Sequence, residues 1–190
     1  MTTPARQLDV ADLEARVKSM YEQVARDPLA QLHFETGRGL AERLGYPAAD
    51  LDRIPGEAID SFAGVGYFLD LAAVTAGDTV LDLGSRSGTD SFLAALAVGE
   101  GGKVIGVDMT PGQLAKALRL AHATPQVDFR EGRIETPPVE QGSVDCVISN
   151  GVINLAPDKA AVFSAAARAL RPGAVWRSPT LLPPSNFPKA

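Results

Sequence analysis

Two short apolar segments, each ending in an acidic residue, constrain most strongly what this chain can fold into. The first, residues 79–83, leads directly into a turn that contains Gly84 and Gly88 and then into a helix-like stretch. Farther along, the second segment ends at Asp108. This pattern predicts a βαβ unit of a parallel sheet, where ligands bind at the carboxyl ends of the strands. Asp82 and Asp108 are therefore expected at the ligand site.

The position of Asp82 indicates which nucleotide the turn would hold. A dinucleotide lays its pyrophosphate on such a turn and on the helix N-terminus behind it, and a carboxylate there would repel it. NAD sites also use Gly-x-Gly-x-x-Gly, which this turn lacks. S-adenosyl-L-methionine carries an ammonium, a sulfonium and no phosphate, so an acid is favourable, and Asp108 suits its ribose hydroxyls. Alternatively, the glycines only permit a tight turn with positive φ.

Composition excludes several other classes of protein. A chain of 190 residues fits one domain, and no apolar run is long enough to span a membrane. The net charge of −5 argues against a nucleic-acid partner. One cysteine, Cys146, and two widely separated histidines give neither a disulfide nor a metal site. Without a recognisable signal peptide, we expect a cytoplasmic protein with a small-molecule ligand.

Strand and helix patterns alternate after residue 78, which predicts an α/β fold with a doubly wound, mostly parallel sheet. Residues 1–60 are expected to form an N-terminal helical lid segment, and residues 61–176 a Rossmann-like domain. The glycine-rich segment 61–67 is either a packed junction or part of the lid. Strands are expected at 79–83, 103–108, 127–130 and 144–149. Helices are expected at 89–98, from Pro111 with Leu114, Ala117, Leu118 and Ala121 inward, and at 158–170.

The sequence resembles class I S-adenosylmethionine-dependent methyltransferases, and within them the arsenite-methyltransferase-like group, which is related to the C-methyltransferases of ubiquinone and menaquinone biosynthesis. The likeness covers residues 60–173 and depends on five motifs, at residues 80–85, 106–114, 132–135, 147–155 and 169–173. It implies an enzyme that transfers a methyl group from S-adenosyl-L-methionine to a small-molecule acceptor.

The resemblance also implies cofactor-binding residues at the strand ends. They are Asp82, Gly84, Ser85 and Gly88 at the methionine end, Asp108 at the ribose, Met109, Ile134 and Glu135 at the adenine, Asn150 beneath the methionine end and Tyr67 in the lid. No catalytic residue is assigned, although His33, Glu35 or Tyr67 could act as a general base. The competing hypothesis is a non-catalytic remnant that binds the cofactor weakly or acts through subunit contacts.

Two departures from the family pattern concern the chemistry. Arg86 stands where the family's turn has its middle glycine, so it either crowds a cationic cofactor or points to solvent. Gly64 and Gly151 occupy positions where arsenite methyltransferases tend to carry cysteine. Cys146 lies in an apolar run, where a thiol usually behaves as a small buried hydrophobe. Arsenic chemistry is therefore not expected.

A third departure concerns the C-terminal residues. The family continues with a strand such as Gly-Arg-Leu-Ala-Ile-Ala-Asp-Ile-Val, and this sequence in G·C-rich codons, read one base out of frame, gives residues 174–181 in order. We expect an irregular, out-of-frame tail at 177–190, although a genuine Pro-rich extension is the alternative. The C-terminal strands would be missing, with the fifth absent or replaced by residues 174–176. The uncovered sheet edge would then allow a homodimer.

Overall fold

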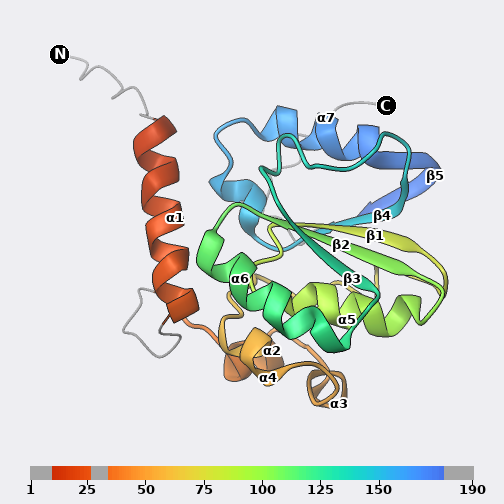
Figure 1. The fold of residues 1–190 in the computed structure, drawn as a ribbon, viewed down its shortest axis with the longest axis horizontal. Helices are drawn as coiled ribbons and strands as arrows, with labels where there is room; N and C mark the ends of the chain where they lie inside the picture. The colour runs from red at the N-terminus through yellow and green to blue at the C-terminus, as the bar shows by residue number, and fades with distance from the viewer. Residues whose placement is uncertain (1–9, 27–33, 178–190) are drawn as a thin grey trace.

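The computed structural model describes residues 10–26 and 34–177. Its centre is a five-stranded parallel sheet with the strand order β3-β2-β1-β4-β5 and with helices on both faces (Figure 1). The strands are β1 (Thr79–Leu83), β2 (Lys103–Asp108), β3 (Val127–Glu131), β4 (Val144–Ser149) and β5 (Leu170–Arg177). The helices are α1 (Val10–Arg26), α2 (Arg38–Arg43), α3 (Ala48–Leu51), α4 (Gly56–Asp60), α5 (Thr89–Val98), α6 (Pro111–Leu120) and α7 (Lys159–Ala169), with short 3₁₀ turns η1 (Ala121–Ala123) and η2 (Val152–Leu155).

The strand order places a crevice at one end of the sheet. β1 pairs in parallel with β2 on one side and with β4 on the other. The chain leaves β1 toward β2 and β3 and later returns to the far side at β4, so the order reverses beside β1. In open α/β sheets, ligands bind outside the carboxyl ends of the strands at this reversal. The topology therefore puts the end of β1, which carries Asp82, at the expected site.

Apolar side chains on both faces of the sheet hold the helices in place. Phe92 of α5 and Leu114 of α6 pack with Val80 and Val104 on one face. On the other face, Val162 of α7 belongs to the second apolar cluster, with Leu81 and Val147. Burial on both faces explains why these strands are almost continuously apolar.

α1 lies along the side of the domain and contacts α6 (Figure 1). Its inner stripe is formed by Val17 and Val24, which are buried at a helical spacing of seven residues. Glu22 accepts a hydrogen bond from the Gly112 amide at 2.9 Å, where α6 begins. An acid at a helix N-terminus satisfies an otherwise free amide and interacts favourably with the helix dipole. α1 is thus tied to the element that follows β2.

The structure confirms the α/β fold with its parallel sheet, and it confirms the helix at 89–98. Pro111 is the first residue of α6, and Asp158 caps α7 by accepting a hydrogen bond from the Ala161 amide at 2.9 Å. The inner face predicted for α6 was wrong at one position, because Leu118 is 51% exposed. Leu114 and Ala117 already fill the space against the sheet.

Of the two alternatives for the fifth strand, absent or replaced by residues 174–176, the structure has the second, because these residues lie within β5. β5 pairs in parallel with β4, with Trp176 opposite Val147, after a shift of register beyond Val144. The ring of Trp176 packs 5.4 Å from that of Phe163 on α7. A strand needs only backbone pairing and a packed face, and residues 170–177 supply both. Residues 178–190 of the predicted tail lie outside the described residues.

The apolar side chains of β1 and β4 are covered in this sheet, since Leu81, Leu83, Val147 and Ile148 are all fully buried. Among the helices of the described ranges, none combines the length and the apolar character that a bilayer crossing requires.

Candidate cofactor site

A pocket of about 640 Å³, open to solvent at its mouth, lies at the carboxyl ends of β1 and β2. It is where the strand order predicts a ligand. Five of the ten residues predicted to bind the cofactor line it, namely Gly84, Asp108, Met109, Ile134 and Glu135. The other lining residues are Val17, Tyr21, Arg86, Thr110, Arg133, Val152, Leu155, Ala156 and Pro157. The lining is mostly apolar with a few charged groups, as is typical of nucleotide sites.

Asp108 is the acid at the edge of this pocket, and backbone amides fix its carboxylate. The Arg86 amide donates to Oδ2 at 2.9 Å, and the Thr110 amide donates to Oδ1 at 2.8 Å. A carboxylate oxygen can accept more than one hydrogen bond. Each oxygen therefore retains capacity for a ribose hydroxyl, and the two amides hold the group in a single orientation.

The turn after β1 requires its two predicted glycines. Gly84 has φ +79°, and a Cβ there would lie 2.6 to 2.8 Å from side-chain atoms of Val152. Gly88 has φ +95°, and a Cβ there would meet Phe129 at 2.5 Å. Only glycine meets both demands without strain. Gly88 does not line the pocket. Its role is to allow the turn to pack against Phe129.

Ser85 adds an unused polar atom to this turn. Its Oγ is the one buried side-chain nitrogen or oxygen atom in the described part of the chain that lacks a hydrogen-bond partner. Buried polar groups are normally paired, so an unpaired hydroxyl beside a pocket is consistent with a ligand that completes it. This observation supports the predicted contact between Ser85 and the cofactor.

Asp82 lies behind the turn and does not line the pocket, in contrast to the expectation that it faces the ligand. It is 2% exposed and accepts a hydrogen bond from the Ser91 hydroxyl at 2.6 Å. Burial, followed by the nearby charge of Asp90, raises the pKa of Asp82 to about 8. At neutral pH this carboxyl is therefore largely protonated, and it supplies little negative charge to the pocket.

Asn150 belongs to a buried polar network around Asp90. Its Nδ2 donates to Asp90 at 3.0 Å and to the Tyr46 hydroxyl at 2.8 Å, while Tyr46 donates to Asp90 at 2.5 Å. The Asn150 Oδ1 accepts from the Val65 amide at 2.8 Å. Burial raises the pKa of Asp90 despite these hydrogen bonds. The network fixes the segment around Val65 to the end of β4, so this segment serves as a packed junction.

Tyr67 lies apart from the pocket. Its ring packs edge-to-face on Tyr46, with centroids 4.9 Å apart, and it lines a separate hollow beside α3 and α5. Glu35, the second candidate base, forms an ion pair with Arg43. His33 lies outside the described residues.

Arg86 points into the pocket, so the alternative of a solvent-facing side chain is wrong. The residue is 9% exposed and has φ +51°, a left-handed conformation that a non-glycine residue adopts at a cost of about 1–2 kcal/mol. Its Nη2 donates to the Tyr21 hydroxyl at 3.2 Å, and its guanidinium carbon lies 5.0 Å from the centre of that ring. Burial opposes its charge, but Tyr21, Asp108 and Asp90 raise the pKa of Arg86 above its usual value.

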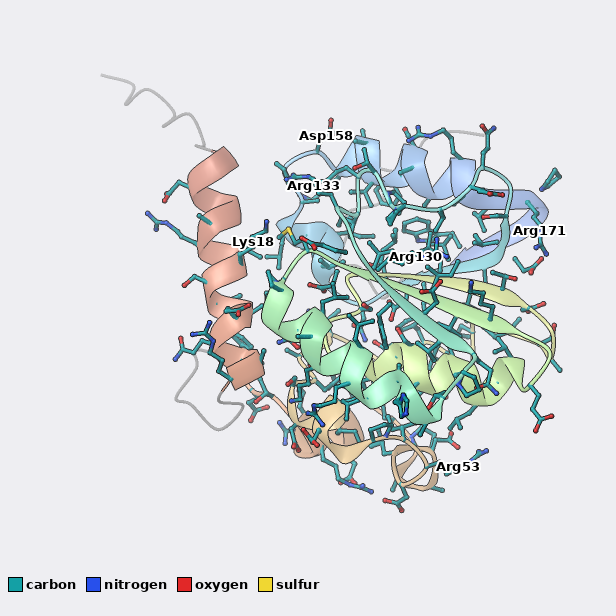
Figure 2. All side chains as sticks on the ribbon, viewed as in Figure 1. Lys18, Arg53, Arg130, Arg133, Asp158 and Arg171 are labelled. Carbon is teal, nitrogen blue, oxygen red and sulfur yellow. The ribbon has the colours of Figure 1, made fainter. Side chains whose placement is uncertain are left out.

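α1 supplies two pocket residues that the sequence analysis did not identify. Val17 and Tyr21 line the pocket, and the Tyr21 carbonyl accepts a hydrogen bond from Gln113 Nε2 at 3.0 Å. The local sequence of α1 does not indicate that its apolar face packs against this pocket. Arg133, labelled in Figure 2, was part of a family motif but had no assigned role, and it lines the pocket from the segment after β3.

A family described as "methyltransferase domain" matches residues 74–180. The chain belongs to this family. The match includes β1, β2 and the pocket residues from Gly84 onward, but not Val17 and Tyr21. Together with the similar proteins below, it identifies a class I S-adenosylmethionine-dependent methyltransferase domain, whose cofactor is S-adenosylmethionine.

Several similar proteins are arsenite methyltransferases. An arsenite methyltransferase of Halobacterium salinarum is 48% identical over 141 residues, which are 73% of this chain and 36% of that protein. The human arsenite methyltransferase is 40% identical over 105 residues, which are 50% of this chain and 28% of that protein. The crystal structure of an arsenic(III) S-adenosylmethionine methyltransferase from Chlamydomonas reinhardtii superposes with a TM-score of 0.63 at 42% identity, covering 68% of this chain and 46% of that one. The chain thus spans less than half the length of these relatives.

The pocket suits a nucleoside at one end better than it suits a methionine group at the other. Asp108, Met109 and Ile134 offer a fixed carboxylate and apolar surfaces, as a ribose and an adenine require. At the other end, Ser85 offers a free hydroxyl, but Arg86 brings a positive charge. The two halves of the pocket therefore differ in how closely they follow the family.

Proposed function

We propose that this methyltransferase transfers a methyl group from S-adenosylmethionine to a small-molecule acceptor that it does not hold through protein thiolates. The observation that carries the proposal is the pocket at the ends of β1 and β2, with the fixed carboxylate of Asp108 at its edge. When bound, the cofactor supplies an electrophilic methyl group on its sulfonium.

The residues of the chain act by binding and positioning. Asp108 accepts hydrogen bonds from the ribose hydroxyls, while Met109 and Ile134 pack on the adenine. Ser85 donates its free hydroxyl to the methionine part. Val17 and Tyr21 of α1 exclude water from the mouth of the pocket. Holding two reactants in line and away from water supplies much of the rate acceleration in reactions of this type.

The proposed acceptor differs from that of the arsenite-methylating relatives. The sequence contains a single cysteine, Cys146, which is 1% exposed within β4 and lies 3.9 Å from the Ala72 carbonyl oxygen. A Cβ at Gly64 would lie 2.5 Å from Asn150 Nδ2, so no larger side chain fits there unless its surroundings move. The described residues therefore offer no accessible thiolate for arsenic.

Two measurements test this proposal. In calorimetric titration, we expect S-adenosylmethionine or its demethylated product to bind and NAD not to bind. In a transfer assay with radiolabelled cofactor, we expect methylation of an organic acceptor from a panel of quinols, phenols and amines, and none of arsenite. Tighter binding of NAD would overturn the cofactor assignment. Arsenite methylation that disappears in Cys146→Ala would overturn the assignment of the acceptor.

A further inference from the structure

Arg86 introduces a charge that the family's turn does not carry, and it places that charge inside the cofactor pocket. The residue stands at a glycine position of the motif and lines the pocket with less than a tenth of its surface exposed. Its Nη2 would lie 3.9 Å from a Cβ built on Gly151, directly after β4. The guanidinium thus lies between the ends of β1 and β4, where the methionine part of the cofactor would extend.

The charge of Arg86 is not neutralised by direct pairing. Within the described ranges, its guanidinium forms no ion pair with a carboxylate, and it donates instead to the uncharged hydroxyl of Tyr21. Asp108 is bonded to the backbone amide of Arg86 and not to the guanidinium. Asp82 is bonded to the Ser91 hydroxyl, and Asp90 to Tyr46 and Asn150, so neither pairs with the guanidinium. Arg86 therefore presents its positive charge to the methionine end of the pocket without a paired carboxylate.

S-adenosylmethionine and its product differ in charge at this end of the pocket. The cofactor carries a sulfonium cation, while S-adenosylhomocysteine, the product, carries an uncharged thioether, and both share the same nucleoside and amino-acid groups. A like charge within several ångströms in a poorly hydrated site disfavours the cation by on the order of tenfold or more in affinity. Removing water from the pocket strengthens this repulsion.

We propose that Arg86 is a charge-selecting residue that shifts the preference of this pocket from the sulfonium cofactor toward its uncharged thioether product. This inference rests on the proposed function, since it presupposes that the pocket binds the cofactor. Tyr21 holds the guanidinium in place through its hydroxyl and its ring. The same contact joins α1 to the lining of the pocket.

The test is a set of affinities for three ligands, S-adenosylmethionine, S-adenosylhomocysteine and adenosine, measured by calorimetry on the full chain. We expect the wild-type protein to bind the thioether at least about tenfold more tightly than the sulfonium compound. Arg86→Gln, which removes the charge but keeps most of the length, should reduce this ratio about tenfold. Arg86→Gly should reduce the ratio to a similar extent, and it should also remove the strain of the left-handed backbone conformation at this position.

Adenosine and a second arginine provide the controls. Adenosine lacks the amino-acid part, so its affinity should change much less in Arg86→Gln than that of S-adenosylmethionine. Arg133→Gln removes another positive charge from the lining of the same pocket, beside Ile134 and Glu135, and should leave the ratio within about twofold.

The outcomes separate the two proposals. Equal affinities for the sulfonium and thioether ligands in the wild-type protein would overturn the role of Arg86 and leave the cofactor assignment intact. An equal gain for the sulfonium and thioether ligands in Arg86→Gln would show that the arginine acts by bulk, which also overturns charge selection. If none of the three ligands binds to any variant, the proposed function itself fails.

Discussion

The ends of β1 and β2 and the edge strand β5 belong to one sheet, yet they depend on the sequence in different ways. At β1 and β2, single side chains have single roles, such as Asp108 facing the pocket and Gly84 at φ +79°. At β5, the sequence departs from the family pattern, but the strand still forms and pairs with β4. Function requires specific atoms at specific places, while a strand requires backbone groups and an apolar face. Departures are therefore costly at the first region and tolerated at the second.

The largest effect is expected from the buried carboxyl of Asp82. Its pKa is raised to about 8 from an ordinary 3.8, so between these values the folded protein keeps a proton that the unfolded chain releases. The free energy of unfolding should therefore fall as the pH rises from about 4 to 8, by on the order of 5 kcal/mol. Above pH 8 both states are ionised and this decline ends. Urea denaturation at a series of pH values measures it.

Two variants sharpen this prediction. Asp82→Asn should remove most of the decline, and Asp90, whose pKa is also raised, accounts for the remainder. Asp128→Asn on β3 is the control. Although burial opposes its ionisation, Arg130 and Lys103 lower the pKa of Asp128, so its contribution is lost only at acidic pH. If wild-type stability does not change between pH 5 and 8, then Asp82 ionises in the folded protein as it does in the unfolded chain, and burial does not raise its pKa.

A smaller but still large effect is expected at the pocket edge. Asp108→Ala should weaken the binding of S-adenosylhomocysteine by about 1–3 kcal/mol, or roughly 10- to 100-fold, because two ribose hydroxyls lose their acceptor. It also frees the amides of Arg86 and Thr110. Glu131→Ala is a matched control, since Glu131 lies opposite Asp108 in the register of β3 and does not line the pocket. An unchanged affinity in Asp108→Ala would remove this residue from the site.

The sequence predicted some features of the fold and of the site and failed to predict others. The pattern of acid, glycine turn and second acid predicted the β1–α5–β2 unit and the pocket, because each feature depends on neighbours within a few residues. It did not predict that Asp82 is buried behind the turn or that Tyr21 reaches Arg86 across the pocket. Those contacts join elements far apart in the chain, which no local pattern encodes. For β5, the comparison with the family left two alternatives open, because a different sequence can satisfy the same pairing.

A moderate effect on stability is expected where β5 packs on the sheet. Trp176 is partly buried against Phe163 and belongs to the apolar surroundings of the cluster beneath α7. Trp176→Ala should lower the free energy of unfolding by about 2 kcal/mol, less than for a fully buried tryptophan. Trp176→Phe keeps the ring contact and should lose less than half of this. If Trp176→Ala has no effect, β5 is not a packed strand, and the contrast with β1 and β2 disappears.

The smallest effect is expected beyond β5. We still predict that residues 174–190 were read out of frame and that residues 177–190 were never selected to pack, a prediction that rests on the match of residues 174–181 to a shifted reading of the family's strand. Proline at 179, 183, 184 and 188 disfavours a central strand. Deleting 178–190 should then change the free energy of unfolding by less than about 0.5 kcal/mol and the melting temperature by about 1–2 °C. A deletion that also removes Trp176 and its strand should lower the free energy of unfolding far more. A large loss of unfolding free energy from removing 178–190 alone would show that these residues stabilise the fold. The tolerance of sequence change that distinguishes β5 from the pocket would then end at Arg177.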